Sequence, residues 1–234
     1  MTKSGAEPRV RVTKNGPYLV SGAVPLARQT IVADAAGGEQ QWRESHPFPV
    51  QESYALCRCG HSEHKPFCDG THAKIGFDGS ESASRQPYRE LAQLKDGPVL
   101  SLSDAEPLCA GADFCQANGT VWSQVEHSDD AGVRTTFVRQ VGHCPSGRLV
   151  AWERATGQPL EPALPLSIGV TEHPSEGVSG PLWLRGRLPV ISAGGFAYEV
   201  RNRQTLCRCG ASKHKPFCDG SHFAVKFRDP GLTE

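Results

Sequence analysis

The chain has no net charge and no long apolar run. Its 234 residues include 25 lysines and arginines against 25 aspartates and glutamates, so charge gives no reason to expect nucleic acid or an anionic membrane as a partner. No stretch approaches the roughly 18 consecutive apolar residues of a membrane-spanning helix. Residues 1–15 also lack the apolar run of a signal peptide. We therefore expect no membrane anchor and no nucleic-acid partner.

Sequence patterns of common enzyme active sites are also missing. There is no Gly-rich phosphate loop, no G-x-S-x-G turn and no spaced pair of carboxylates that would support hydrolysis. Long helical patterns are scarce, whereas 25 glycines and 18 prolines favour short strands and turns. The sequence therefore predicts a mostly β protein with short helices and no autonomous active site.

A sixteen-residue segment occurs twice. CRCGHSEHKPFCDGTH covers residues 57–72, and CRCGASKHKPFCDGSH covers residues 207–222. Both copies contain three cysteines and one histidine at the same spacing, and these potential ligands are Cys57, Cys59, Cys68, His72, Cys207, Cys209, Cys218 and His222. Thiolates and imidazoles at such density are typical of zinc or iron–sulfur sites. Each copy is therefore a candidate metal centre.

The spacing favours iron–sulfur over zinc. Structural zinc sites usually draw on C-x2-4-C pairs from two arms, but the first pair here is the tighter C-x-C. The four residues divide naturally into two ligand pairs, Cys57 with Cys59 and Cys68 with His72. One pair for each iron of a [2Fe-2S] cluster is the arrangement that this division predicts.

The run C-x-C-x2-S-x3-P-x-C-D-G-[ST]-H resembles the CDGSH, or NEET, iron–sulfur family, and both copies satisfy every fixed position. The resemblance implies a [2Fe-2S] cluster in each copy, with the C-x-C pair on a buried iron and the Cys/His pair on an outer iron. Single-motif members pair as homodimers beneath a shared β cap. The resemblance therefore implies a monomer with an internal pseudo-two-fold axis. Two independent modules on a linker remain the alternative.

The connecting loop also carries residues with a structural interpretation. Asp69 and Gly70 form a turn that can cap a short helix carrying His72. The hydroxyl groups of Ser62 and Ser212 either donate to a bridging sulfide or close a turn of their own loop. The sequence leaves these two roles open.

The two repeats lie at the ends of the chain. We expect a first module over residues 1–94, a middle domain over 95–158 and a second module over 159–234, with a proline-rich linker at 159–165. Strands are expected at residues 30–33, 53–56, 197–200 and 204–206. Counted from Gly16 and from Gly180 to the first cysteine, the first module is 14 residues longer, which predicts an insertion near residues 35–38.

The middle domain contains the three remaining cysteines, Cys109, Cys115 and Cys144. The pattern C-x2-A-x2-C with a distant C-P resembles a divergent mono-cluster ferredoxin in which one cysteine has become Ala112. Three thiols could hold a [3Fe-4S] cluster, or a [4Fe-4S] cluster with a non-cysteine ligand such as His143. The alternative is that they pack as small hydrophobic residues.

Two helices are expected in the same domain. Ser103 followed by Glu106 has the spacing of a capping box, which predicts a short helix carrying Cys109 and Cys115. The apolar spacing from Val133 onward predicts a second short helix that ends near Gly142.

The sequence thus predicts an iron–sulfur protein that transfers single electrons between redox protein partners. Two alternatives stay open: cluster storage, transfer to apo acceptors or redox and iron sensing, and a structural zinc module for protein interaction. Nine cysteines, an odd number, favour a reducing compartment such as the cytoplasm. At equivalent positions the first loop has His61 and Glu63, whereas the second has Ala211 and Lys213. The added positive charge favours an extra electron, which predicts that the second site is the more oxidising one.

Overall fold

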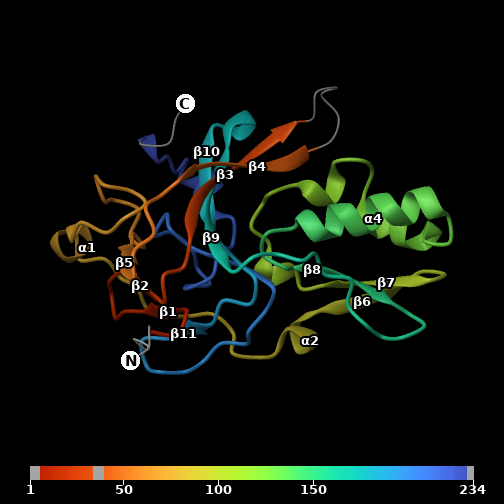
Figure 1. Ribbon diagram of the computed structural model, residues 1–234, viewed down its shortest axis with the longest axis horizontal. Coiled ribbons are helices and arrows are strands. Elements are labelled where there is room, and N and C mark those ends of the chain that lie inside the picture. Colours follow the sequence, from red (N-terminus) through yellow and green to blue (C-terminus); the bar gives the residue numbers. More distant parts are fainter. Residues whose placement is uncertain (1–5, 34–39, 231–234) are drawn as a thin grey trace, which may run out of the picture.

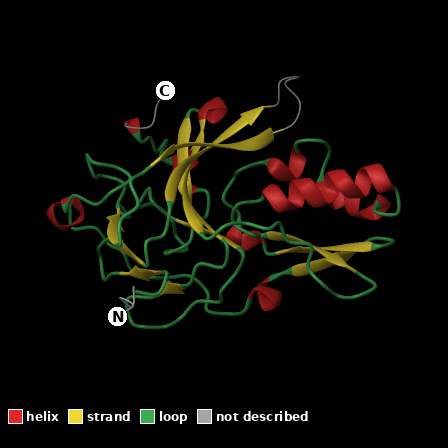
Figure 2. Cartoon of the chain, in the orientation of Figure 1, coloured by secondary structure: helices red, strands yellow, loops and turns green. Residues whose placement is uncertain are grey.

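The computed structural model describes residues 6–33 and 40–230, and these residues form a mostly β structure with short helices (Figures 1 and 2). The first module contributes β1 (Arg9–Val12), β2 (Tyr18–Ser21), β3 (Leu26–Ala33), β4 (Gln40–Pro47) and β5 (Ser53–Leu56). The second module contributes β9 (Ser167–His173), β10 (Val178–Arg185), β11 (Val190–Ile191) and β12 (Arg203–Leu206). The predicted fold class is confirmed.

Strands are exchanged between the two modules. One sheet has the order β11-β1-β2-β5 and the other the order β12-β10-β9-β3-β4. β11 of the second module pairs in parallel with β1, where Val190 faces Val10. β3 of the first module pairs in parallel with β9, where Leu26 faces Ile168. Each module therefore completes the sheet of the other, which excludes the model of independent modules.

Each sheet also contains one equivalent antiparallel pair, made within a single module by the strand that leads to the cysteines and its neighbour. β2 pairs with β5 so that Tyr18 faces Leu56, and β10 pairs with β12 so that Leu182 faces Leu206. All four side chains belong to one apolar core made by both modules. Because this core is shared, the pseudo-two-fold arrangement is stabilised by the same burial that stabilises each module.

The insertion in the first module extends β3 and adds β4. Residues 34–39, where the insertion was expected, lie outside the described residues, but the strands on either side form an antiparallel arm. Trp42 of this arm packs against Phe114 and Trp183, with ring centroids 5.0 Å and 4.9 Å away. Its indole N–H donates to the carbonyl of His143 at 2.9 Å. The arm therefore joins the middle segment to the second module.

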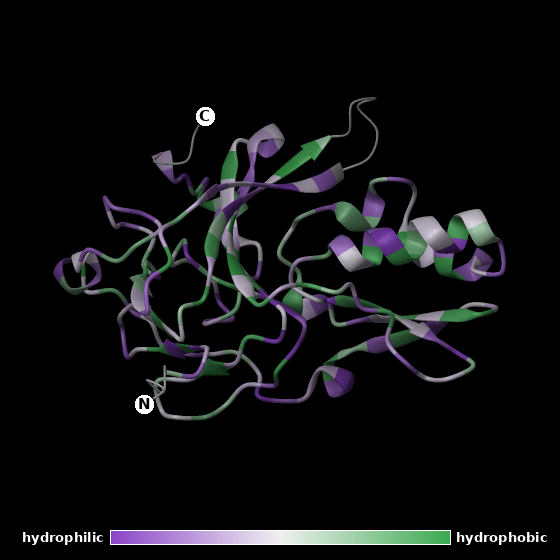
Figure 3. Cartoon of the chain, viewed as in Figure 1, coloured by the Kyte–Doolittle hydropathy of each residue, from purple (hydrophilic) through white to green (hydrophobic). Residues whose placement is uncertain are grey.

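The middle segment is a small sheet with its longest helix on one face and a short helix from the preceding connection on the other (Figure 1). Its strands are β6 (Gln93–Asp96), β7 (Leu100–Asp104) and β8 (Leu149–Glu153), and its helices are α2 (Tyr88–Leu91), α3 (Val121–Gln124) and α4 (Ala131–His143). Phe137 and Val141 of α4 share a buried core with Leu102 and Ala151, and hydrophilic residues lie between the hydrophobic ones along α4 (Figure 3). The helix predicted from Val133 to about Gly142 is confirmed.

Two predicted elements are wrong. Ser103 lies in β7, where its hydroxyl contacts the Tyr88 hydroxyl at 2.8 Å, so it caps no helix. Only a 3-10 turn follows, over Glu106–Leu108. Residues 197–200 form no strand. Ala197 makes one isolated bridge, to Ile191, and residues 198–200 have no regular secondary structure. The strands expected at 30–33, 53–56 and 204–206 are confirmed within β3, β5 and β12.

The predicted linker at 159–165 is packed against its neighbours. The partly exposed Glu161 forms an ion pair with the buried Arg203 at 2.8 Å. The Arg203 guanidinium also donates to the carbonyls of Val141, Cys144 and Leu149 at 2.6–3.0 Å. One side chain of the second module thus holds the end of α4 and the segment that follows it. No helix in the described part of the chain is long and apolar enough to span a membrane.

Candidate metal centres

The first candidate site brings its four predicted residues together as two pairs. The Cys57 and Cys59 sulfurs lie 3.8 Å apart just after β5. The Cys68 sulfur lies 3.4 Å from Nδ1 of His72, which is carried by α1 (Thr71–Lys74). These are the two pairs that the spacing predicts.

The second site repeats this geometry. The Cys207 and Cys209 sulfurs are 3.6 Å apart after β12, and the Cys218 sulfur lies 3.5 Å from Nδ1 of His222 on α5 (Ser221–Ala224). Over the described residues, no group of three or more His, Cys, Asp or Glu side chains is gathered tightly enough to hold one metal ion. The ligands of each site instead stand as separate pairs.

Backbone hydrogen bonds fix both loops in the same way. Cys57 N donates to Pro66 O at 2.8 Å, and Cys207 N donates to Pro216 O at 2.9 Å. The N–H of Cys68 donates to Ala55 O at 2.9 Å. Each inner cysteine is therefore tied to the residue two positions before the outer cysteine of the same loop.

The loop serine closes a turn. The Ser62 hydroxyl donates to Phe67 O at 2.7 Å and accepts from His64 N at 3.1 Å. Ser212 makes the same two bonds in the second loop. Of the two roles left open by the sequence, the structure thus shows the turn.

Asp69 holds the start of α1 as predicted. Its carboxylate accepts from the N–H groups of Glu63 and Thr71 at 2.8 and 3.0 Å. These N–H groups stabilise the charged form and lower the pKa of Asp69 below its usual value. The carboxylate links the two ends of the loop and so fixes the helix that carries His72.

In each inner pair, the pKa of the first thiol is lowered, which favours its thiolate form. A hydrogen bond from Cys59, followed by those from the backbone N–H groups of Ser62 and Gly60, outweighs burial and lowers the pKa of Cys57. Cys207 is lowered by the same contacts, beginning with Cys209. The same hydrogen bonds, together with burial, raise the pKa of Cys59 and Cys209. Since the thiolate is the form that binds metal, Cys57 and Cys207 are the thiols of the inner pairs that ionise first.

Two buried arginines were not singled out from the sequence. Arg58 donates to the carbonyls of Thr13 and Gly79 at 3.2 and 2.6 Å. Arg208 donates to the carboxylates of Glu172 and Asp229, both at 2.6 Å. The signal was present, because an arginine stands between the first two cysteines of both copies.

The two loops meet at the pseudo-two-fold axis. A Cβ on Gly60 would collide with the carbonyl of Cys209, and a Cβ on Gly210 with that of Cys59. Both glycines also have φ near +80°, which side chains disfavour. Across the same axis, the Tyr18 hydroxyl of the first module bonds to Cys207 O at 2.8 Å. The two candidate centres are therefore built as one unit.

The outer ligand pairs differ in exposure. Cys68 and His72 are half-buried, whereas Cys218 and His222 retain only 2% and 3% of their exposure. The cover comes from the middle segment, where Gly111 packs on the Phe223 ring and lines one small cavity with His222. This burial lowers the pKa of His222 to about 4. Figure 1 shows α1 at the opposite end of the molecule from α4.

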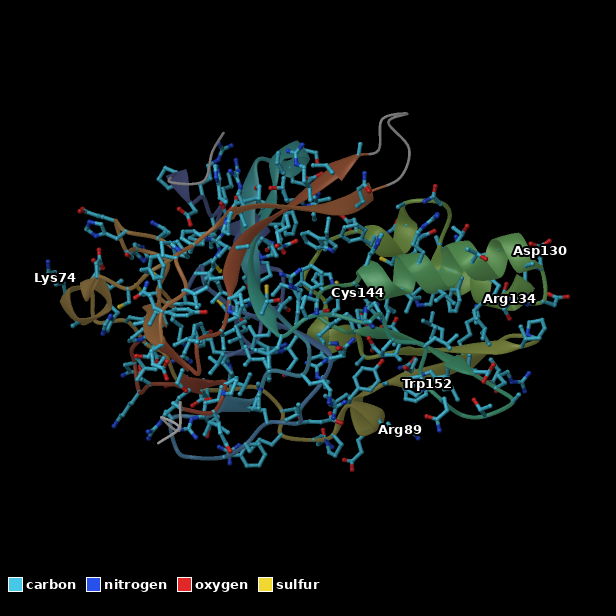
Figure 4. All side chains as sticks on the ribbon, viewed as in Figure 1. Lys74, Arg89, Asp130, Arg134, Cys144 and Trp152 are labelled. Carbon is cyan, nitrogen blue, oxygen red and sulfur yellow. The ribbon has the colours of Figure 1, made fainter. Side chains whose placement is uncertain are left out.

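The three middle cysteines line one recess. Cys109, Cys115 and Cys144 border it together with Asp113 and Arg148, and Figure 4 places Cys144 at the end of α4. Burial, and then the charges of Cys144 and Cys109, raise the pKa of Cys115 to about 11. Cys109 and Cys115 lie on separate turns, so the expected single helix is wrong.

His143, which the sequence suggested as a fourth ligand, lies outside the wall of this recess. The His143 ring packs edge-on against Phe114, with centroids 5.2 Å apart, and is not among the residues that border the recess. Asp113 borders it instead, with a left-handed backbone at φ 55°.

Comparison with known families agrees with this architecture. The family model described as iron-binding zinc finger CDGSH type matches residues 15–73 and 179–223. A model described as divergent 4Fe-4S mono-cluster matches residues 95–154. The chain is therefore an iron–sulfur protein. It is a tandem CDGSH-type protein with a divergent 4Fe-4S mono-cluster segment between its repeats. No curated protein and no solved structure matches it significantly.

Proposed function

We propose that the chain is a one-electron carrier that binds two [2Fe-2S] clusters, each by three cysteines and one histidine. The proposed ligands are Cys57, Cys59, Cys68 and His72 in the first site and Cys207, Cys209, Cys218 and His222 in the second. The observation that carries the proposal is the pairing of these side chains at 3.4–3.8 Å in both loops. Two pairs per loop suit a two-iron cluster.

A [2Fe-2S] cluster supplies the ability to accept and release one electron. The chain's own residues provide the rest. The bonds from Cys57 N and Cys207 N hold the inner pairs in place, and the buried Arg58, between the first two cysteines of the motif, adds a positive charge to the first loop. The half-exposed His72 offers partners a contact at the surface.

We extend the proposal to a third centre held by Cys109, Cys115 and Cys144, as a [3Fe-4S] cluster or a [4Fe-4S] cluster with a fourth ligand that is not cysteine. The shared recess and the matching family model support it. Asp113 and Ser146 both border the recess and are the candidate oxygen donors. The guanidinium of Arg148, which forms an ion pair with Asp104 at 2.6 and 2.8 Å, borders the same recess.

A second function is favoured by one observation, the exposure of the Cys68 and His72 pair. A half-exposed ligand pair is accessible to an acceptor, so the first site suits cluster transfer to an apo protein. In this role the first site would exchange its cluster and the covered second site would keep it.

The other proposals concern setting and partners. We place the chain in the cytoplasm, since all nine cysteines are free thiols. Redox proteins or apo iron–sulfur acceptors are the proposed partners of a monomeric chain. The divisions 1–94, 95–158 and 159–234 remain our proposed domains, with the first and third interlocked through their sheets.

Metal analysis of protein purified without oxygen tests the ligand assignment. We expect about two irons and two sulfides per CDGSH repeat, plus three or four irons for the middle centre. The triple variant Cys109→Ser, Cys115→Ser, Cys144→Ser should lose only the latter. Colourless protein with stoichiometric zinc would refute the proposal.

Mixing dithionite-reduced protein with an oxidised redox protein, or oxidised protein with an apo ferredoxin, separates the two functions. An electron carrier is reoxidised with its iron retained. A cluster donor loses visible absorption and iron to the acceptor. Iron retained in both mixtures with no reoxidation would contradict both functions.

A further inference from the structure

A pocket lies where the first module, the middle segment and the second module meet. Its wall contains Arg85 from the connection after the first module, Pro107 from the middle segment, and Tyr198 and His214 from the second module. Its volume of about 360 Å³ suits a small organic molecule. None of the proposed metal ligands borders it.

One wall of the pocket is aromatic. The rings of Tyr198 and Phe217 meet edge to face with centroids 5.1 Å apart, and both side chains are buried. Phe217 immediately precedes Cys218 in the chain. Aromatic walls of this kind accept a planar ring by offset or edge-on contact.

The pocket also carries two cations, whose ring and hydrogen-bond partners are uncharged. The Arg201 guanidinium lies over the Phe217 ring at 5.9 Å and donates to Ser146 O at 3.0 Å. The exposed Arg85 guanidinium lies over the Phe196 ring at 4.7 Å. Aromatic rings and a carbonyl attract these groups without neutralising them. The carboxylate of Glu199 opposes the charge of Arg201 in part, so Arg85 is the cation that is freer to bind an anion.

The remaining charged groups of the wall leave the balance positive. Glu199 is the carboxylate present, and its Oε2 accepts from Tyr88 N at 2.6 Å. His214 contacts the carbonyl of Pro107 through Nδ1 at 3.3 Å. Two guanidinium groups against one carboxylate favour an anionic ligand.

The first module provides an internal comparison. Phe48 and Phe67 form the same edge-to-face pair with centroids 5.5 Å apart. The position that corresponds to Arg201, 150 residues earlier, is Gln51. The ring pair is therefore common to both modules, whereas the cation at position 201 has an uncharged counterpart in the first.

We propose that this pocket binds a small aromatic anion, a planar ring that carries a carboxylate or sulfonate group. The ring contacts Tyr198 and Phe217, and the anionic group lies between Arg85 and Arg201. The ligand would touch the loop of the second site and no part of the first. This inference is independent of the cluster type and of the direction of electron transfer.

Isothermal titration calorimetry of the full metal-loaded chain tests it, with naphthalene-2-sulfonate and naphthalene-2-carboxylate as probes and 2-naphthalenemethanol as the uncharged analogue. We expect saturable binding of one molecule of each anion and weaker binding of the alcohol. Arg85→Gln should weaken anion binding about tenfold, since it removes a charged donor, and Arg85→Lys should restore part of the affinity.

Arg89→Gln is the matched control. Arg89 is also exposed and stacked over an aromatic ring, that of Trp152 at 4.5 Å, but it does not border this pocket (Figure 4). The proposal requires that this variant bind the anions like the original chain. Absence of saturable binding, equal affinity for the alcohol, unchanged affinity in Arg85→Gln or an equal loss in both variants would overturn it.

Discussion

The two cluster loops share nearly all of their sixteen residues, yet their surroundings differ. In the first loop the outer pair is half-exposed, and the buried Arg58 contacts carbonyl groups. In the second the outer pair is buried, and Arg208 contacts two carboxylates. The motif thus sets which atoms can bind metal, while residues outside it set the accessibility and charge of each site.

The source of this difference is the middle segment together with the end of the chain. Phe223, whose counterpart 150 residues earlier is Ala73, lies beside His222 with ring centroids 4.4 Å apart and receives Gly111 on its face. Asp229, which pairs with Arg208, follows α5 near the end of the described residues. The second site is therefore enclosed by the middle segment and by the residues that follow α5, whereas the first site is not.

The largest expected effect concerns the arginines. Arg208→Met leaves two carboxylates buried without their cation, which should reduce the free energy of unfolding by about 3–5 kcal/mol. Arg58→Met leaves carbonyls without a donor and should cost about 1–3 kcal/mol. Urea unfolding of the metal-loaded variants measures both losses. Equal losses would show that the carboxylates around Arg208 do not distinguish the sites.

The second prediction concerns acid. Burial lowers the pKa of His222 to about 4, so a proton competes for its ring nitrogen only near that pH. Between pH about 6.5 and about 4 the folded chain binds fewer protons at this group than the unfolded chain, so stability decreases as pH falls through this window. Visible absorption followed during acidification should show the exposed first site released at higher pH than the covered second site.

The Phe223→Ala variant sharpens this test. Removing the ring opens the second site and should move its release toward that of the first. Ala73→Phe is the control, because the middle segment does not cover α1 and the added ring should protect little. Simultaneous release of both sites from the original chain would contradict the comparison.

The third prediction concerns the order of reduction. The second site has two buried carboxylates around one guanidinium, whereas the first has a guanidinium alone. One unit charge about 10 Å away, at an effective dielectric of about 20, changes the energy of adding an electron by roughly 1.7 kcal/mol, or about 70 mV. The first site should therefore be reduced first.

Redox titration followed by electron paramagnetic resonance measures this order. Asp229→Asn should raise the potential of the second site and narrow the gap. This order is the reverse of the one predicted from Glu63 and Lys213. If the second site is reduced first, the buried charges do not control the potentials.

The smallest effect is expected from those surface charges themselves. Glu63 and Lys213 are exposed, and exposed charges are screened by water and salt. Exchanging them, as Glu63→Lys with Lys213→Glu, should shift each potential by no more than about 10 mV. A reversal of the reduction order in the same titration would restore the prediction made from the sequence.

The fold and the ligand pairs were predictable because they depend on short-range pattern. The two Cys/His sets lie within sixteen residues, and the strands that precede them end directly at Cys57 and Cys207. The resemblance implied the pseudo-two-fold pair but not the exchange of strands, since parallel pairing of β3 with β9 joins residues about 140 positions apart.

What escaped prediction depends on distant partners. Ser103 and Glu106 have the spacing of a capping box, but pairing of β7 with β6 and β8 keeps Ser103 in a strand. The partners of Arg58 and Arg208 lie 21 to 45 residues away. The cover that Gly111 provides for Phe223 comes from another segment. No local pattern contains such contacts.

The exchange of β3 and β11 has a consequence for dilution. In a dimer of separate subunits, strands from different chains pair only when two chains meet. The folded dimer therefore dissociates as the protein concentration falls. Here both partners are attached to one chain, and the encounter is replaced by a fixed effective concentration. The two sites can therefore form around the same axis even when few molecules are present, and the unfolding midpoint should not vary with protein concentration.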